Sequence, residues 1–151
     1  MKVRIHAIAG LIGLMTILTF WTSTVASELL GRPETIAAVK AMILWGMLIL
    51  VPAMITVAGS GRSLARGRSG DAVQAKARRM PIIALNGLLI LVPCALYLSG
   101  KAGSGDFDNW FYGVQALELM AGATNIALMS LNARDGLRLT GRFRKPSVWP
   151  A

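Results

Sequence analysis

Four long apolar stretches alternate with short polar segments along this chain of 151 residues. They run over about 5–27, 36–58, 81–99 and 109–131. A helix needs about 20 apolar residues to cross the hydrocarbon core of a bilayer, so each stretch predicts one membrane span. The polar segments between them are too short to form a soluble domain. We therefore predict an all-α fold, an integral membrane four-helix bundle of up-down-up-down topology, formed as one domain by residues 1–151.

The fourth stretch carries strongly polar residues at helical spacing. Starting from Asp108, positions three or four residues apart hold Phe111, Gln115, Glu118, Gly122, Asn125, Met129 and Asn132. Residues at this spacing share one face of a helix. Ionisable and amide side chains are costly when they face lipid, so we expect this face, here called the polar seam, to turn toward the other helices. Gly122 on the seam would allow a neighbouring helix to approach closely.

Turn and proline signals place the helix ends. Gly31 is expected to end the first helix, Pro33 to open the second and Pro81 to open the third. The segment 59–79 is predicted to be the longest loop, and 100–106 a short flexible one. The motif GMLILVPA at 46–53 is echoed by GLLILVPC at 87–94, which predicts proline-kinked helices on both sides of the long loop. The echo is compatible with coincidence or with duplicated halves.

The charge distribution predicts the topology. The net charge is +9, and 13 of the 16 lysines and arginines lie before the first span, between the second and third, or after the fourth. The positive-inside rule therefore predicts a bacterial-type inner membrane protein with both termini cytoplasmic, including a basic tail at 133–151. The acids Glu28, Glu34, Asp106 and Asp108 fall on the opposite side. An aromatic belt is predicted near that side, made of Trp21, Tyr97, Trp110, Phe111 and Tyr112.

The first apolar stretch also resembles a secretory signal, since a short basic start precedes it and TVAS follows it. It is long for such a signal, and Thr16, Thr19 and Trp21 interrupt it. We expect it to be retained as the first span.

Glu118 is the residue whose burial most needs an explanation. An acid near the middle of a bilayer costs about 2.5–3.5 kcal/mol on insertion scales, so it must be paired, protonated or open to water. Lys40 is the only base inside a span, and one interpretation is a Glu118–Lys40 ion pair. In the other, Lys40 reaches outward to Glu28 or Asp108, and a protonated Glu118 bonds Gln115 or a hydroxyl of the first span. A functional interpretation is a carboxylate that accepts protons or contacts a quinone.

His6, the only histidine, begins the first span on the face of Gly10 and Gly13. Membrane cytochromes b hold each haem b between two histidines, and this chain has one, so haem would need His6 alone or a pair of His6 residues across a dimer. The alternative is a structural histidine that bonds Asn132 or a lipid headgroup. Cys94 is the only cysteine, which excludes an intramolecular disulfide, and no cluster of residues has the spacing of a metal site.

Asn86 and Asn125 are predicted to lie at similar depth on the third and fourth spans. Amide side chains inside a bundle bond across helices, typically with about 0.6 kcal/mol each. We expect these two residues to join the spans, with a ligand contact as the alternative.

Three functions are compatible with these features, and the sequence motifs of common enzyme classes are absent. The first is an accessory or structural membrane subunit, alone, as a homo-oligomer or in a larger membrane complex. The second is a redox protein associated with quinone or haem through His6 and Glu118, and the third a proton-coupled carrier or channel that uses Glu118. The basic loop and tail flank spans, so we expect them to attract anionic lipids and not nucleic acid.

Overall fold

The computed structural model describes residues 1–65 and 70–139, and within these ranges every long element is helical. The elements are α1 (Lys2–Leu30), α2 (Pro33–Ala65), α3 (Asp71–Asn86), the π-helical turn η1 (Gly87–Leu91), α4 (Val92–Gly103) and α5 (Asn109–Leu139). α3, η1 and α4 follow one another without a break and form a single rod. Four helical rods are therefore present, each long and apolar enough to cross a membrane, as the sequence predicted.

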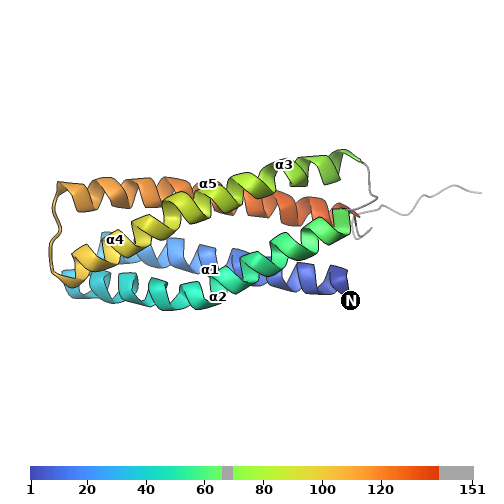
Figure 1. Ribbon diagram of the computed structural model, residues 1–151. Coiled ribbons are helices and arrows are strands. Elements are labelled where there is room, and N and C mark those ends of the chain that lie inside the picture. The colour runs from blue at the N-terminus through green and yellow to red at the C-terminus, as the bar shows by residue number, and fades with distance from the viewer. Residues whose placement is uncertain (66–69, 140–151) are drawn as a thin grey trace, which may run out of the picture.

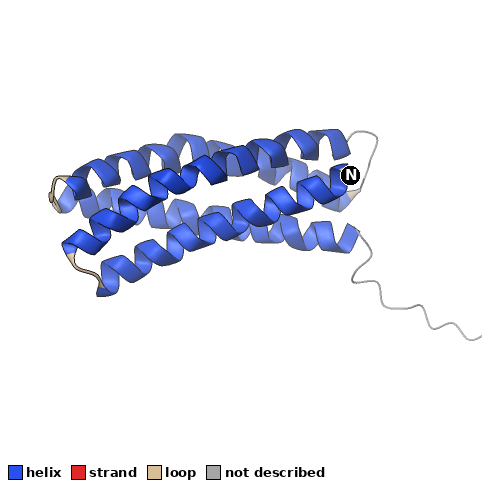
Figure 2. Cartoon of the chain, turned by 90° about the horizontal axis from the view of Figure 1, so that it is seen from below, coloured by secondary structure: helices blue, strands red, loops and turns tan. Residues whose placement is uncertain are grey.

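Consecutive rods run in opposite directions (Figure 1). α1 and α2 pack against each other along their length, and α5 packs on α1, α3 and α4. α2 contacts α4 but hardly touches α3. Seen from below, the four rods lie side by side as an elongated bundle (Figure 2). The weak α2–α3 contact leaves this bundle less tightly closed on one side.

The helices extend well beyond the predicted spans. Most of the predicted loop at 59–79 is helical, because α2 continues to Ala65 and α3 already begins at Asp71. The predicted loop at 100–106 likewise loses its first part to α4. Alanine, arginine, lysine and glutamine are good helix formers, so a helix continues past the apolar stretch that marks the membrane. The predicted tail at 133–151 begins inside α5, and its part from 140 onward lies outside the described residues, as do 66–69.

Two of the predicted helix ends are confirmed and one is wrong. α1 ends at Leu30 with Gly31 as its cap, and α2 begins at Pro33. Pro81, predicted to open a helix, lies inside α3. The π-helical turn η1 ends two residues before the next proline, Pro93, and the Val92 N–H bonds the carbonyl of Gly87 five residues back. Proline has no N–H and its ring crowds the carbonyl four residues earlier, which the wider turn accommodates.

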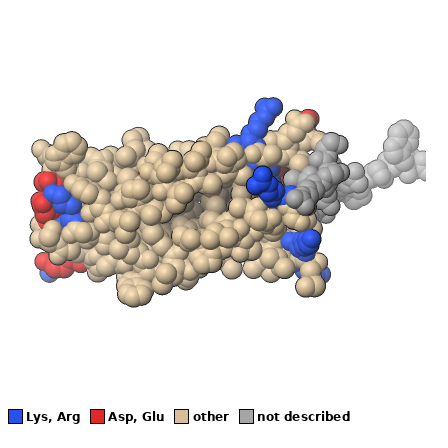
Figure 3. Space-filling model, in the orientation of Figure 1, with Lys and Arg blue, Asp and Glu red and all other residues tan. Residues whose placement is uncertain are grey.

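The surface is much more apolar than that of a soluble protein, and one charged side chain is fully buried. Large apolar side chains such as Trp45, Leu48 and Trp110 are exposed, whereas Lys40 is fully buried. Figure 3 shows that the lysine, arginine, aspartate and glutamate side chains on this face gather at the two ends of the molecule, with an uncharged band between. Such a surface suits contact with hydrocarbon, because exposed hydroxyls such as those of Thr19 and Thr22 donate to carbonyls of their own helix and do not depend on water.

The polar seam of α5 is confirmed as its inward face. Phe111, Gln115, Asn125, Met129 and Asn132 are all buried. The predicted aromatic belt is only partly correct: Tyr97, Trp110 and Tyr112 are exposed, but Phe111 is fully buried beside Leu98. Trp21 is also turned inward, and its indole N–H donates to the carbonyl of Leu119. Gly122 permits that approach, because a Cβ there would lie 3.1 Å from the indole ring.

Candidate functional site

Lys40 of α2 and Glu118 of α5 form a buried ion pair. Lys40 Nζ lies 2.6 Å from Glu118 Oε2, and the side chains are 1% and 12% exposed. Gln115, one turn earlier on α5, donates from Nε2 to the same carboxylate oxygen at 3.1 Å. The ion-pair interpretation is thus confirmed, and Lys40 does not reach outward. A charged hydrogen bond of this kind is stronger than a neutral one, and it offsets part of the cost of burying both ions.

A second carboxylate borders this pair. Glu28, on α1, is close enough to Lys40 and Glu118 to be affected by both charges. Its Oε1 atom and the Oε1 atom of Gln115 are buried without a hydrogen-bond partner among the described residues. At this end of the bundle, which we call the paired end, the Lys40 ammonium is paired with Glu118, and the carboxylate of Glu28 lies near the pair without an ion pair to Lys40 among the described residues. Spare acceptor atoms remain beside the pair.

Asn86 and Asn125 join the third rod to α5. Asn86 donates from Nδ2 to Asn125 Oδ1 and to the carbonyl of Ala121, both at 2.8 Å. Asn125 in turn donates to the carbonyl of Ile83 at 3.3 Å. Asn86 is the last residue of α3 before η1, and the bond from Asn125 satisfies the carbonyl of Ile83 close to this change in helix type. The predicted link between the two spans is confirmed.

His6 lies at the opposite end of the bundle, between two partners. Its Nδ1 is 2.8 Å from Ser60 Oγ of α2, and its Nε2 is 2.8 Å from Lys76 Nζ of α3. The predicted contact with Asn132 is wrong, since Asn132 instead accepts from Arg79 at 3.4 Å. Both ring nitrogens of His6 are engaged, so axial ligation of a haem would first require the loss of one of these bonds. His6, Lys76 and Arg62 in the last turn of α2 define this end of the bundle, which we call the basic end.

A second ion pair at the basic end was not predicted. Arg79 of α3 and Asp135 of α5 are joined by a 2.7 Å contact between Nη1 and Oδ2. Asp135 continues the seam three residues after Asn132, so the helical spacing contained the signal. It was missed because Asp135 was assigned to a tail beyond the membrane span and Arg79 to a loop.

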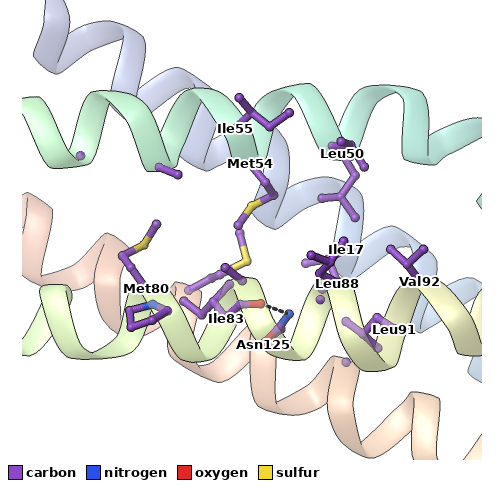
Figure 4. Close-up of a pocket in the computed structure, with 18 of the residues that line it drawn as sticks. Ile17, Leu50, Met54, Ile55, Met80, Ile83, Leu88, Leu91, Val92 and Asn125 are labelled. Carbon is purple, nitrogen blue, oxygen red and sulfur yellow. Dashed lines mark hydrogen bonds between the residues drawn. The ribbon is translucent and has the colours of Figure 1, made fainter.

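A cavity of about 910 Å³ extends along the bundle between these two ends. Six of its lining side chains carry strongly polar groups: His6, Thr24, Arg62, Lys76, Glu118 and Asn125. The walls between them are apolar and come from all four rods. In Figure 4, Met54 of α2 reaches across the space toward Ile83 of α3, with Leu88 and Leu91 of η1 farther along.

The cavity lies where α2 and α3 hardly touch. The face formed by these two elements is hollowed near its middle (Figure 3). Ala84 of α3, Leu88 of η1 and Ile55 of α2 are exposed and also line the cavity, so they form its rim. Because this face is otherwise uncharged, the opening faces the same surroundings as the apolar surface. No feature of the sequence predicted the cavity.

The polar residues predicted as candidates are therefore divided among three places. Gln115, Glu118 and Lys40 form the paired end, Asn86 and Asn125 join two rods midway, and His6 lies at the basic end. Among the described residues, no group of histidine, cysteine, aspartate or glutamate side chains is arranged to hold a metal ion. In comparisons with protein-family models, curated proteins and solved structures, no significant match was found for this chain.

Proposed function

We propose that this chain is a multi-pass inner-membrane protein that binds a lipid-class molecule in its cavity without chemically changing it. The cavity carries this proposal: about 910 Å³ of space with apolar walls and a few polar groups is the form that binding sites for small molecules take. Binding a lipid without changing it is an accessory role, which is the first of the functions that the sequence allowed. In this proposal the buried polar contacts hold the helices around the ligand.

The proposed orientation places both termini and the connection at 66–69 in the cytoplasm. Lys2, Arg62 and Arg79 all belong to the end of the bundle where the chain starts, whereas Glu28, Glu34 and Asp106 belong to the other end. This separation of charge supports an up-down-up-down arrangement across a bacterial-type inner membrane. Association with further copies or with a larger membrane complex is compatible with the exposed apolar surface.

The alternatives receive less support from the geometry. A proton path between Glu118 and His6 would need ordered water along the cavity, but water is held only where two to four polar partners are available, and most of the walls are apolar. A haem role is opposed by the two hydrogen bonds that occupy both His6 nitrogens. Binding of a lipid-like molecule requires neither ordered water nor a free histidine nitrogen, because the apolar walls of the cavity can contact hydrocarbon directly.

Filling the rim of the cavity tests the proposal. Ala84→Trp should place an indole in the opening, whereas Ala127→Trp places the same side chain on an exposed position of α5 that does not line the cavity. Native mass spectrometry of the detergent-purified protein should then show a bound lipid-class molecule in the wild type and in Ala127→Trp, and its loss in Ala84→Trp. Absence of any such molecule from the wild type, even after incubation with membrane lipid extract, would overturn the proposal.

A further inference from the structure

Lys76 is a cation at the cavity wall, and the described residues provide no anionic partner for it. Its ammonium contacts His6 Nε2 at 2.8 Å, and no carboxylate of the described residues lies within ion-pair distance of it. Asp135, whose negative charge acts on Lys76 from a distance, is itself held by Arg79 at 2.7 Å. A partly buried charge without a counter-charge is costly unless something else in the site neutralises it.

The hydrogen bonds around His6 show that it serves Lys76 as a neutral acceptor. Ser60 donates its hydroxyl hydrogen to the carbonyl of Thr56, so toward His6 it can only accept, and His6 Nδ1 must carry the hydrogen. The lone pair of Nε2 then faces the Lys76 ammonium. One ammonium hydrogen is used in this way, and the other two have no acceptor among the described residues. His6 thereby positions the ammonium without cancelling its charge.

Arg62 adds a second cation to the same end of the cavity. It lines the cavity from α2, is exposed, and forms no ion pair with the described residues. The basic end thus presents an ammonium and a guanidinium, whereas the walls beyond them are apolar. This polarity matches a molecule with an anionic group at one end and hydrocarbon over the rest.

We propose that the cavity binds an anionic phospholipid, with its phosphate at Lys76 and Arg62 and an acyl chain along the apolar walls. The inference rests on the proposed function and names its ligand class. Phosphate oxygens accept charge-assisted hydrogen bonds from both cations, and basic pockets between membrane helices are known sites for such headgroups. The opening between α2 and the third rod lets a chain enter sideways from the bilayer. A zwitterionic lipid fits less well, because its own ammonium competes with Lys76 and Arg62 for the phosphate.

The test compares lipids and matched charge removals in the purified full chain. Delipidated protein is titrated with phosphatidylglycerol or phosphatidylcholine, and the bound lipid is counted by native mass spectrometry. Lys76→Met removes the proposed phosphate ligand. Arg78→Met removes a charge two residues away on α3, at an exposed position that does not line the cavity. Lys76→Arg keeps the charge.

Wild type, Arg78→Met and Lys76→Arg should prefer phosphatidylglycerol, and Lys76→Met should bind it about tenfold more weakly while keeping its affinity for phosphatidylcholine. Arg62→Met, at an exposed position where folding is not at stake, should show a smaller loss of the same preference. Equal binding of both lipids by the wild type, or equal losses in Lys76→Met and Arg78→Met, would overturn the headgroup assignment while leaving the lipid-binding function intact. If the wild type binds neither lipid, the proposed function fails as well.

Discussion

Two lysines inside the bundle are held in opposite ways. Lys40 is 1% exposed and lies 2.6 Å from the Glu118 carboxylate, so its charge is neutralised within the protein. Lys76 meets the neutral ring of His6 at 2.8 Å and lines a cavity. In the first arrangement the Lys40 charge is paired within the protein, and the pair joins α2 to α5. The second still has charge and hydrogen-bonding capacity to offer, so it suits a ligand better than a role in holding the helices together.

A buried charge therefore does not by itself mark a functional site. Before the partners are known, Glu118 looks like the best candidate, because it is an acid in an apolar helix. Once Lys40 and Gln115 are placed beside it, its burial is explained by structure. Lys76, in contrast, has no carboxylate of the described residues within ion-pair distance, and it lines the cavity.

The largest predicted effect comes from breaking the paired end. Lys40→Met should lower the free energy of unfolding by about 3–5 kcal/mol, because it leaves the Glu118 carboxylate buried without its partner. Reversible unfolding in mixed micelles, followed by circular dichroism, measures the loss. The double variant Lys40→Met/Glu118→Gln should recover most of it, since neither charge then remains. A single variant as stable as the wild type would mean that the pair is not a structural link.

The same substitution at the basic end should have a much smaller effect. Lys76→Met leaves no opposite charge unpaired, and it removes a cation that was itself costly to bury. We expect the free energy of unfolding of this variant in lipid-free detergent to equal that of the wild type or to be slightly higher. A loss comparable with that of Lys40→Met would show that Lys76 also holds the helices together, which would remove the contrast between the two ends.

The smallest effect is expected from a third lysine, which is accessible to solvent. Lys101 donates to Asp106 and Asp108 at the start of α5, and the hydrogen bond from Lys101 holds the pKa of Asp108 below its usual range. Because the folded pKa is depressed, this stabilisation is present at neutral pH and is lost as the pH falls below about 4 and through the depressed value. Thermal unfolding between pH 7 and 3 measures it.

Asp108→Asn provides the matched control for that titration. Asp108 Oδ1 accepts from the Phe111 N–H at 2.8 Å and so caps α5, and asparagine can keep this cap without the charge. The variant should show a weaker loss of stability in acid than the wild type. Identical acid profiles would mean that Lys101 and Asp108 contribute no measurable stability, as is common for exposed ion pairs.

Much of the fold, and the paired end of the site, could be predicted from residue spacing. The seam from Phe111 to Asn132 depends only on helical periodicity, so its burial was predictable without the other helices. Lys40 and Glu118 could be matched because they are opposite charges within spans and few other partners were available. The partners of His6 could not be found in this way, since Lys76 had been assigned to a loop and many polar groups lay at similar depth.

Two nearly identical segments show most clearly that local sequence does not determine the type of helix. GMLILVPA in α2 is α-helical throughout, whereas GLLILVPC begins with the π-helical turn η1 and continues into α4. The ring of Phe20 packs over Gly46 in the first, and Asn125 lies beside Gly87 in the second. The two segments have nearly the same intrinsic preference for helix type, so the difference between them arises from the side chains that each one packs against.

The sequence by itself determined four apolar helices, their polar seam, the α1–α2 turn and the separation of charge between the two ends. These follow from periodicity, turn chemistry and composition, which are properties of neighbouring residues. Only the tertiary structure decided that α2 and α3 stand apart and that a cavity lies beside them. It also decided that, among the described residues, Lys76 rather than Glu118 has no counter-charge within ion-pair distance. The reason is that a cavity, and the partner of a buried charge, depend on side chains from several helices that no local pattern brings together.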